Sequence, residues 1–584
     1  MSTYNKNNKI VNPMTQSTPV PPRTVPHVRA RSLLLASMLA SPLVWLVQPA
    51  QAQLLTNISV GNPKGLALAH AVTADPPGID SIHFNPAGLT QIRGRQTNVK
   101  LLVAHVELES RFGEPTLPTA EGKEVYYSVN EQCQTDYPLD GGSTAEEIAN
   151  AHNQCWGVDP VANSTTRTGD PIVMVPFLGV NETPILALPS GGAAFEFGDG
   201  NMVFGSAVFV PEGIGLTREE DGAGSYQGQE VALSRITYFS PTVGMRLSET
   251  LSAGVGVHFS YQGMYVATNF RAPTLTLGYI RDLNNIQGSP LPPIEFGPYD
   301  NVGLLTMEME DFMSASVNFG LLWEPEPWLA LGFVYRSESK ADLEGDFTME
   351  NTDEFLHTAE GLSENALVTG LLVLLGGAPL NAQKVESGTV KMEYIVPQHV
   401  AFGASIKVVP SLKLNLDLKW SEYSAWDALE FEFDKNVDFL SFGTAIATAA
   451  GYNLTTPSSM VITREYENTW SWAVGVEYQL NNNWVLRGGY EPRTSAIPDD
   501  RTDLILPIGD ADLYTVGLGW QYDRVTRFDA AFAYLYSETS TAACESQNAN
   551  SCIEGNVVYN PYYSMPFENE VNGFLLAVSM DRKF

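Results

Sequence analysis

The alternation of residues 251–261 constrains the fold more than any other feature of this sequence. They read LSAGVGVHFSY, so one set of alternate side chains is apolar or aromatic and the other is small or polar. Such a period of two predicts a β-strand with one face in an apolar environment. Soluble strands usually have ~5–6 residues, whereas a strand that crosses a bilayer needs ~9–11. The run therefore predicts a transmembrane strand.

The same pattern recurs in pairs. Alternating segments flank short turns near residues 199–200, 324–327, 409–411, 481–483 and 523–524, and longer acidic segments rich in Gly, Pro and Asn separate these hairpins. Short turns at one end and long loops at the other are typical of outer-membrane barrels. We predict an all-β fold, a transmembrane antiparallel barrel of fourteen strands that begin near residues 96, 190, 201, 234, 251, 313, 328, 388, 412, 466, 484, 511, 526 and 571.

Composition argues against other classes of protein. Only 17% of residues are charged, and no apolar run is long enough for a transmembrane helix. The formal charge of -33 disfavours nucleic acid as a partner, and 44% hydrophobic residues argue against disorder. We find no nucleophile motif, no phosphate-binding loop and no cysteine or histidine spacing typical of a metal site. We therefore expect no enzymatic activity, no cofactor and no metal.

The N-terminus predicts export. Arg29 and Arg31 precede an apolar run at 33–47 and a small-residue cleavage site at 50–52, which is the layout of a signal peptide. We assign residues 1–52 to it, and the expected destination is the outer membrane of a Gram-negative bacterium. Four cysteines allow three pairings in an oxidising compartment. Pairing Cys133 with Cys155 and Cys544 with Cys552 closes the shortest loops, both on the outer side.

An ordered set of short motifs runs through the rest of the chain: GNPKGLALAHA at 61–71, FNPAGL at 84–89, YRS at 335–337, WSEYS at 420–424, RGGY at 487–490 and IPDDR at 497–501. Together they resemble the outer-membrane long-chain fatty acid transporter family of the FadL/TodX type. The resemblance implies a monomeric barrel, residues 96–584, plugged by an N-terminal hatch, residues 53–95. Within the hatch it singles out Asn85, Pro86 and Ala87.

The resemblance also implies a function. Family members bind a hydrophobic small molecule between long outer loops, pass it to an internal pocket and release it sideways into the bilayer at a kinked third strand. The expected partners are therefore this ligand, the lipid of the outer membrane and lipopolysaccharide. Two alternatives from other classes remain, a general diffusion porin and a surface adhesin barrel.

Two predicted outer loops, near 264–312 and 346–390, carry unusual apolar residues for exposed segments. The nearly unbroken apolar run at 366–375 is either a helix packed on its own loop or one wall of a capture groove. The candidates for this groove are Leu367, Leu371, Leu374, Leu277 and Tyr279.

Two arginines are candidates for binding a ligand headgroup. Arg271 lies after the fifth predicted strand and Arg464 before the tenth, near positions where the family has cations. A carboxylate headgroup needs such a partner. The alternative is that each arginine pairs with one of the many acids. Because the chain is so acidic, a neutral hydrocarbon stays open beside a fatty acid as the ligand.

The third predicted strand is interrupted. Pro211 lacks an N–H for the ladder, and Gly213 and Gly215 weaken a strand. The resemblance interprets this stretch as a lateral opening. The alternative is that the strand simply frays at the outer rim.

Overall fold

The computed structural model describes residues 57–115, 142, 144, 158–197, 200–271, 295–297, 299–449, 456–552 and 560–584. The predicted signal peptide, Cys133, Cys155, Leu277 and Tyr279 lie outside these residues. No helix in the described part of the chain is long and apolar enough to span a membrane.

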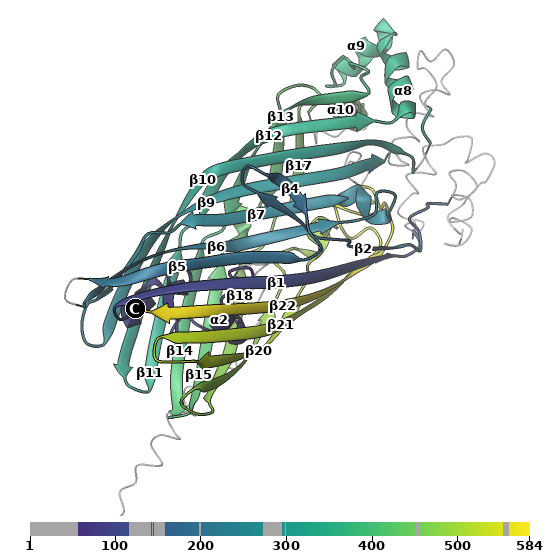
Figure 1. The fold of residues 1–584 in the computed structure, drawn as a ribbon. Helices are drawn as coiled ribbons and strands as arrows, with labels where there is room; N and C mark the ends of the chain where they lie inside the picture. Colours follow the sequence, from purple (N-terminus) through teal and green to yellow (C-terminus); the bar gives the residue numbers. More distant parts are fainter. Residues whose placement is uncertain are drawn as a thin grey trace, which may run out of the picture. The chain divides into compact units, whose positions relative to one another are not determined.

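In these described ranges, fourteen antiparallel strands form a closed barrel (Figure 1), as predicted. Five of them are each divided into two labelled segments. In chain order the strands are β1 (Arg95–Phe112), β5 (Leu186–Phe197), β6 (Met202–Thr217), β7 and β8 (Glu230–Phe239, Thr242–Arg246), β9 (Leu251–Arg271), β10 (Asn301–Glu326), β11 and β12 (Leu329–Arg336, Ser339–Asn351), β13 and β14 (Val385–Val396, His399–Val409), β15 and β16 (Leu412–Ser421, Ala428–Phe433), β17 and β18 (Ser459–Thr463, Thr469–Gln479), β19 (Trp484–Arg493), β20 (Ala511–Gln521), β21 (Thr526–Thr541) and β22 (Phe567–Lys583).

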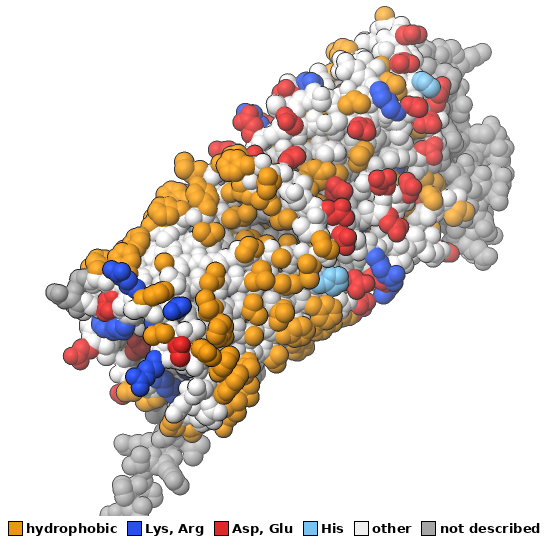
Figure 2. All heavy atoms as spheres, viewed as in Figure 1, with side chains coloured by type: hydrophobic (Ala, Val, Ile, Leu, Met, Phe, Trp, Pro, Cys, Tyr) orange, Lys and Arg blue, Asp and Glu red, His pale blue; other side chains and the backbone are white. Residues whose placement is uncertain are grey.

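The last strand closes the barrel on the first. β22 pairs with β1 in continuous antiparallel register from Gln96↔Lys583 to Phe112↔Phe567. Along β22, exposed Phe574, Leu576 and Val578 alternate with buried Leu575 and Ala577. On the face seen in Figure 2, hydrophobic side chains cover a band of the strands, and acidic side chains gather toward the end that carries the outer helices. This is the pattern of a barrel with a lipid-facing band.

The loops are as unequal as predicted. Short turns such as 247–250, 410–411 and 522–525 join strands at one end, and long connections join them at the other. The outer connections carry the small strands and helices β2 (Thr165–Arg167), β3 (Ile172–Val175), β4 (Gly179–Glu182), η3 (Ala223–Gln227), α8 (Asp353–Ser363), α9 (Ala366–Leu374), α10 (Asp438–Ala449) and η5 (Asp499–Arg501). The short helix η4 (Tyr423–Ala425) instead separates β15 from β16 within one barrel strand.

Several predicted boundaries were wrong. β10 begins at Asn301 rather than near 313, and the tenth strand begins at Ser459 rather than near 466. The loop predicted at 264–312 is therefore only 272–300, and the loop predicted at 346–390 is 352–384. In the outer part of β10, Glu308 is exposed while Met307 and Met309 are buried. The strand continues there with polar side chains outward, a pattern that does not resemble a lipid-facing strand.

The segment before β1, residues 57–92, packs against lumen-facing side chains of the wall and is called the hatch below. It contains α2 (Pro63–Ala67), η1 (Gly78–Asp80), α3 (Ser81–Phe84) and η2 (Pro86–Gln91). A Cβ added to any of nine wall glycines would lie within 3 Å of a hatch atom: Gly192, Gly244, Gly254, Gly320, Gly332, Gly403, Gly475, Gly489 and Gly517. These glycines lie toward the short-turn end, so the hatch fits the wall there by close backbone approach.

Candidate transport path

The barrel wall has a gap between β5 and β6. Their ladder runs only from Phe197↔Met202 to Gly191↔Val208. Beyond it, β5 continues to pair with β1 as far as Leu186, and β6 continues to pair with β7 as far as Thr217. Over their outer halves the facing edges of β5 and β6 therefore do not pair with each other, and at the outer end of β6 the Thr217 carbonyl oxygen accepts a hydrogen bond from the Gly169 amide at 2.9 Å. Unpaired backbone at membrane depth is tolerated only where it lines a cavity or opening.

The predicted interruption lies beside this gap. The β6–β7 register shifts between Phe209 and Glu212, so Pro211 sits in a β-bulge. A bulge bends its strand and increases the local twist. Gly213 and Gly215 follow it, and a Cβ at Gly215 would lie 1.6 Å from the carbonyl oxygen of Ile172. Gly215 is therefore required for the close approach of β3, whereas Gly213 has only Val210 nearby, at 3.5 Å.

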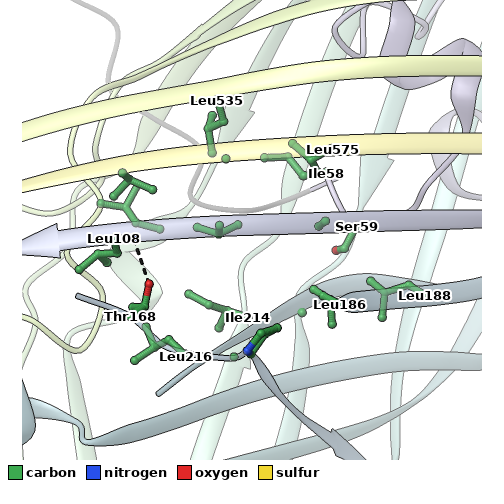
Figure 3. A pocket seen from close by; sticks show the side chains of 18 of the residues that line it. Ile58, Ser59, Leu108, Thr168, Leu186, Leu188, Ile214, Leu216, Leu535 and Leu575 are labelled. Atoms are coloured by element: carbon green, nitrogen blue, oxygen red, sulfur yellow. Dashed lines mark hydrogen bonds between the residues drawn. The ribbon is translucent and has the colours of Figure 1, made fainter. Parts of the chain in front are cut away.

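An apolar pocket adjoins the gap (Figure 3) and is called the gap pocket below. Its lining comes from the hatch, the gap edges and the closing strands, and includes Ile58, Leu102, Leu188, Gly213, Ile214, Gly215, Leu535 and Leu575. Polar groups are few, and the Thr168 hydroxyl among them already accepts a hydrogen bond from the Leu108 amide at 3.0 Å. The pocket suits an apolar ligand.

Sequence reasoning missed most of this lining. Leu102, Leu535 and Leu575 occupy inward-facing positions of β1, β21 and β22 and are buried. The lumen of a transmembrane barrel is usually polar. Leucines on the inward face of three strands that adjoin one another were therefore a signal that could have located the pocket.

The outer helix α9 is packed on its own loop and also exposes apolar side chains, so it has the features of both alternatives that the sequence left open. Val368 and Leu372 are buried against the loop core that also contains residues of α8 and α10. Leu367 and Leu374 are 68% and 80% exposed, and Leu371 is 39% exposed. The helix is thus packed on one side and presents an apolar stripe on the other.

Both candidate headgroup arginines are buried and paired. Arg271 donates from Nη1 and Nη2 to the two carboxylate oxygens of Asp159, at 2.8 and 3.0 Å. Arg464 donates to Asp503, and both side chains are buried. The pairing with acids that the sequence left as an alternative is therefore present at both sites. A role in headgroup binding stays a prediction and would require a ligand to displace these carboxylates.

Polar contacts fix the hatch to the wall. The side chain of Asn85 caps η2 through the Ala87 amide and donates to the carbonyl oxygens of Thr73 and Leu321. Asp80 binds Lys100 of β1, and both side chains are fully buried. On the opposite wall, Asp75 binds Lys413 of β15 at 2.9 Å.

Two hatch groups titrate abnormally. Although burial opposes it, the ammonium groups of Lys64 and Lys413 lower the pKa of Asp75, so this carboxylate stays ionised. His70 lies 3.1 Å from Glu491 of β19. Burial lowers the pKa of His70 to about 4, against the opposing effect of Glu491. His70 is therefore a neutral hydrogen-bonding group near neutral pH.

The last outer loop contains a disulfide between Cys544 and Cys552, as predicted. Cys133 and Cys155 lie outside the described residues, so their pairing stays a prediction. No cluster of three potential metal-ligating side chains occurs among the residues that the structure describes.

A closed barrel with an internal hatch, a lipid-facing band and an apolar pocket at a wall gap defines an outer-membrane transport barrel. Residues 43–584 match the family described as outer membrane protein transport protein (OMPP1/FadL/TodX). The chain belongs to this family, and it is therefore an outer-membrane protein of a Gram-negative bacterium.

Individual relatives are distant. A long-chain fatty acid transport protein of Escherichia coli is 20% identical over 221 residues, which are 38% of this chain and 42% of that protein. The chain thus matches less than half the length of this curated relative. A FadL homologue of Pseudomonas aeruginosa is 16% identical, with a TM-score of 0.61 over 90% of this chain and 98% of the other. The toluene transporter TodX of Pseudomonas putida is 13% identical, with a TM-score of 0.53 over 89% and 98%. At these identities the solved structures show the fold alone.

Proposed function

We propose that this protein carries hydrophobic molecules through the outer membrane. In this proposal the exposed stripe of α9 captures the molecule, the gap pocket holds it, and the gap between β5 and β6 releases it into the bilayer. The domain division follows: residues 1–52 direct export, residues 53–95 plug the lumen, and residues 96–584 form the barrel and its outer loops.

The observation that carries the proposal is the coincidence of the wall gap with the apolar pocket. Each unpaired backbone group in contact with lipid costs several kcal/mol, which favours a function for the opening. Burying an alkyl chain in an apolar pocket gains ~0.8 kcal/mol per CH₂. Release through the side of the barrel spares the molecule a return to water.

The names of the relatives suggest two substrate classes. One relative is a long-chain fatty acid transport protein, and two solved structures are a toluene transporter and a monoaromatic hydrocarbon channel. We therefore propose fatty acids or aromatic hydrocarbons as substrates. A general diffusion porin is less well supported, because hatch residues occupy the lumen side of many wall strands.

Gly213→Phe tests the route. The first side-chain atom at this position has room, and a phenyl ring there would enter the gap pocket. A strain lacking the protein, complemented with wild type, Gly213→Phe or Gly213→Ala, would be assayed for uptake of labelled fatty acid and labelled toluene.

We expect Gly213→Phe to abolish most uptake and Gly213→Ala, which adds one methyl group, to leave most of it. Heat-modifiable migration on a gel would show that each barrel is folded. Wild-type uptake through a folded Gly213→Phe barrel would contradict lateral release. Uptake of neither substrate by the wild type would contradict the proposed function itself.

A further inference from the structure

A second cavity in the lumen is polar and is called the polar cavity below. Its lining includes Glu212, Arg235, Arg336, His83, His258 and His399. Phe209 and Pro211 of the β6 bulge also line it, so it adjoins the strand that borders the wall gap. The cavity therefore combines two guanidinium groups and three imidazoles with the single carboxylate of Glu212.

The guanidinium of Arg235 has weak partners. Its Nη1 lies 3.8 Å from Glu212 Oε1, which is beyond hydrogen-bonding distance. Its Nη2 donates to Ser316 Oγ at 3.4 Å, and its Nε is buried with no hydrogen-bond partner. Arg235 is itself buried, with 8% of its surface exposed. A buried cation with so little compensation is costly unless something else pairs with it.

Arg336 also has no carboxylate among its hydrogen-bond partners. Its Nη1 lies 3.0 Å from Nε2 of His83, and its Nη2 donates to Asn57 Oδ1 at 3.2 Å. Its Nε has no hydrogen-bond partner, and neither has Nε2 of the neighbouring His258. Neutral groups of the hatch therefore hold this cation in place without neutralising it.

Three other buried arginines of the barrel differ. Arg271, Arg464 and Arg487 each donate directly to a carboxylate, from Asp159, Asp503 and Asp529 respectively. Within the described ranges, Arg235 and Arg336 donate to no carboxylate. The barrel thus pairs the two arginines that the family resemblance singled out directly with carboxylates, and it leaves Arg235 and Arg336 without a carboxylate at hydrogen-bonding distance.

The polar cavity continues into apolar space. An adjoining cavity shares Glu212, Pro397 and Tyr423 with it and is otherwise lined mainly by apolar and aromatic side chains, including Leu233 and Trp426. This apolar cavity in turn shares Gly213, Ile214 and Ile508 with the gap pocket. The polar cavity, the apolar cavity and the gap pocket therefore adjoin one another in this order.

We propose that the polar cavity is a headgroup site for a hydrophobic molecule with one carboxylate, which Arg235 and Arg336 bind while its tail lies in the apolar cavity toward the gap. The inference rests on the proposed transport function and makes its substrate class an amphipathic acid rather than a neutral hydrocarbon. Arginine suits this role because its fork of N–H donors matches a carboxylate. A neutral ligand would leave Arg235 with only the 3.8 Å contact to Glu212 and Arg336 with only neutral partners.

Paired ligands test the site. Purified full-length protein in detergent would be titrated with radiolabelled dodecanoate and with 1-dodecanol, which has the same chain without the charge. The variants are Arg235→Gln, Arg235→Lys and the control Arg246→Gln. Arg246 lies on the next segment of the same barrel strand and is partly buried, but its Nη2 donates to the hatch carbonyl of Thr90 and it does not line the polar cavity.

Arg235→Gln would replace a hydrogen bond between two charged groups by a weaker one from a neutral amide. We therefore expect this variant to bind dodecanoate about tenfold or more weakly than wild type. We expect dodecanol binding to be unchanged, Arg235→Lys to retain part of the preference for the acid, and Arg246→Gln to match wild type. Equal loss for both ligands, or no loss for either, would overturn the headgroup site. A wild type that binds dodecanol as tightly as dodecanoate would overturn it too, while leaving the proposed transport function intact; binding of neither ligand would contradict both.

Discussion

Lys100→Met should release the hatch from the wall. The ammonium of Lys100 binds Asp80 of η1, and the exposures of the two side chains are 0% and 1%. After the substitution, Asp80 would keep only the amide donors of Asn62 and Asn98, at 2.6 and 3.2 Å. Removing one partner of a buried ion pair costs about 3–5 kcal/mol. Since ~1.4 kcal/mol is a tenfold change, the ratio of docked to undocked hatch should fall by a factor between about 10² and 10⁴.

Single-channel recording in planar bilayers measures this ratio. Wild type should be closed almost always, and Lys100→Met should show frequent openings and faster cleavage of the hatch by added protease. The double variant Asp80→Asn/Lys100→Met should recover most of the closed state, because no unpaired charge remains buried. Wild-type closure in Lys100→Met, or a double variant as open as the single one, would refute the assignment of this ion pair as a clamp.

Three further predictions concern other parts of the molecule. Changing the three exposed leucines of α9 to Ser should reduce uptake at low substrate concentration while moving the free energy of unfolding by no more than about 0.5 kcal/mol, as measured by denaturation. A peptide map under non-reducing conditions should recover both local cysteine pairs, and any cross-pair would contradict this. Burial lowers the pKa of His70 to about 4 from 6.5, so the undocked hatch binds a proton more readily than the docked one. The contribution of neutral His70 to the free energy of hatch docking should therefore be fully present above pH 6.5 and fall by about 3 kcal/mol as the pH drops toward 4. His70→Gln should remove this pH dependence, as measured by proteolysis of the hatch at a series of pH values.

The strands that cross the bilayer were predictable because lipid imposes a simple rule. Residues facing lipid must be apolar, so Phe574, Leu576 and Val578 of β22 alternate with inward residues and reveal the strand. Where β10 rises beyond the apolar band, water faces the outer side, and polar residues such as Glu308 replace apolar ones. The rule then fails, which is why the start of this strand was misplaced.

The site was only partly predictable, because its properties depend on pairs of residues far apart in sequence. Pro211 and the glycines after it located the bulge, since each has a backbone property readable from one residue. The pairing of Arg271 could not be predicted in this way, because its partner Asp159 lies 112 positions away in the sequence. The same is true of Arg235, because its 3.8 Å contact with Glu212 joins residues of two different strands.

Photo-crosslinking in native membranes tests lateral release most directly. Cells would take up a fatty acid with a diazirine at the end of its chain, and after brief illumination the labelled peptides of the protein would be mapped. We predict labelling of the two edges of the gap, around Leu188 of β5 and Ile214 of β6, and its loss in Gly213→Phe. Labelling that avoids these edges and falls instead on the hatch and the short turns of the barrel would show passage along the barrel axis and contradict lateral release.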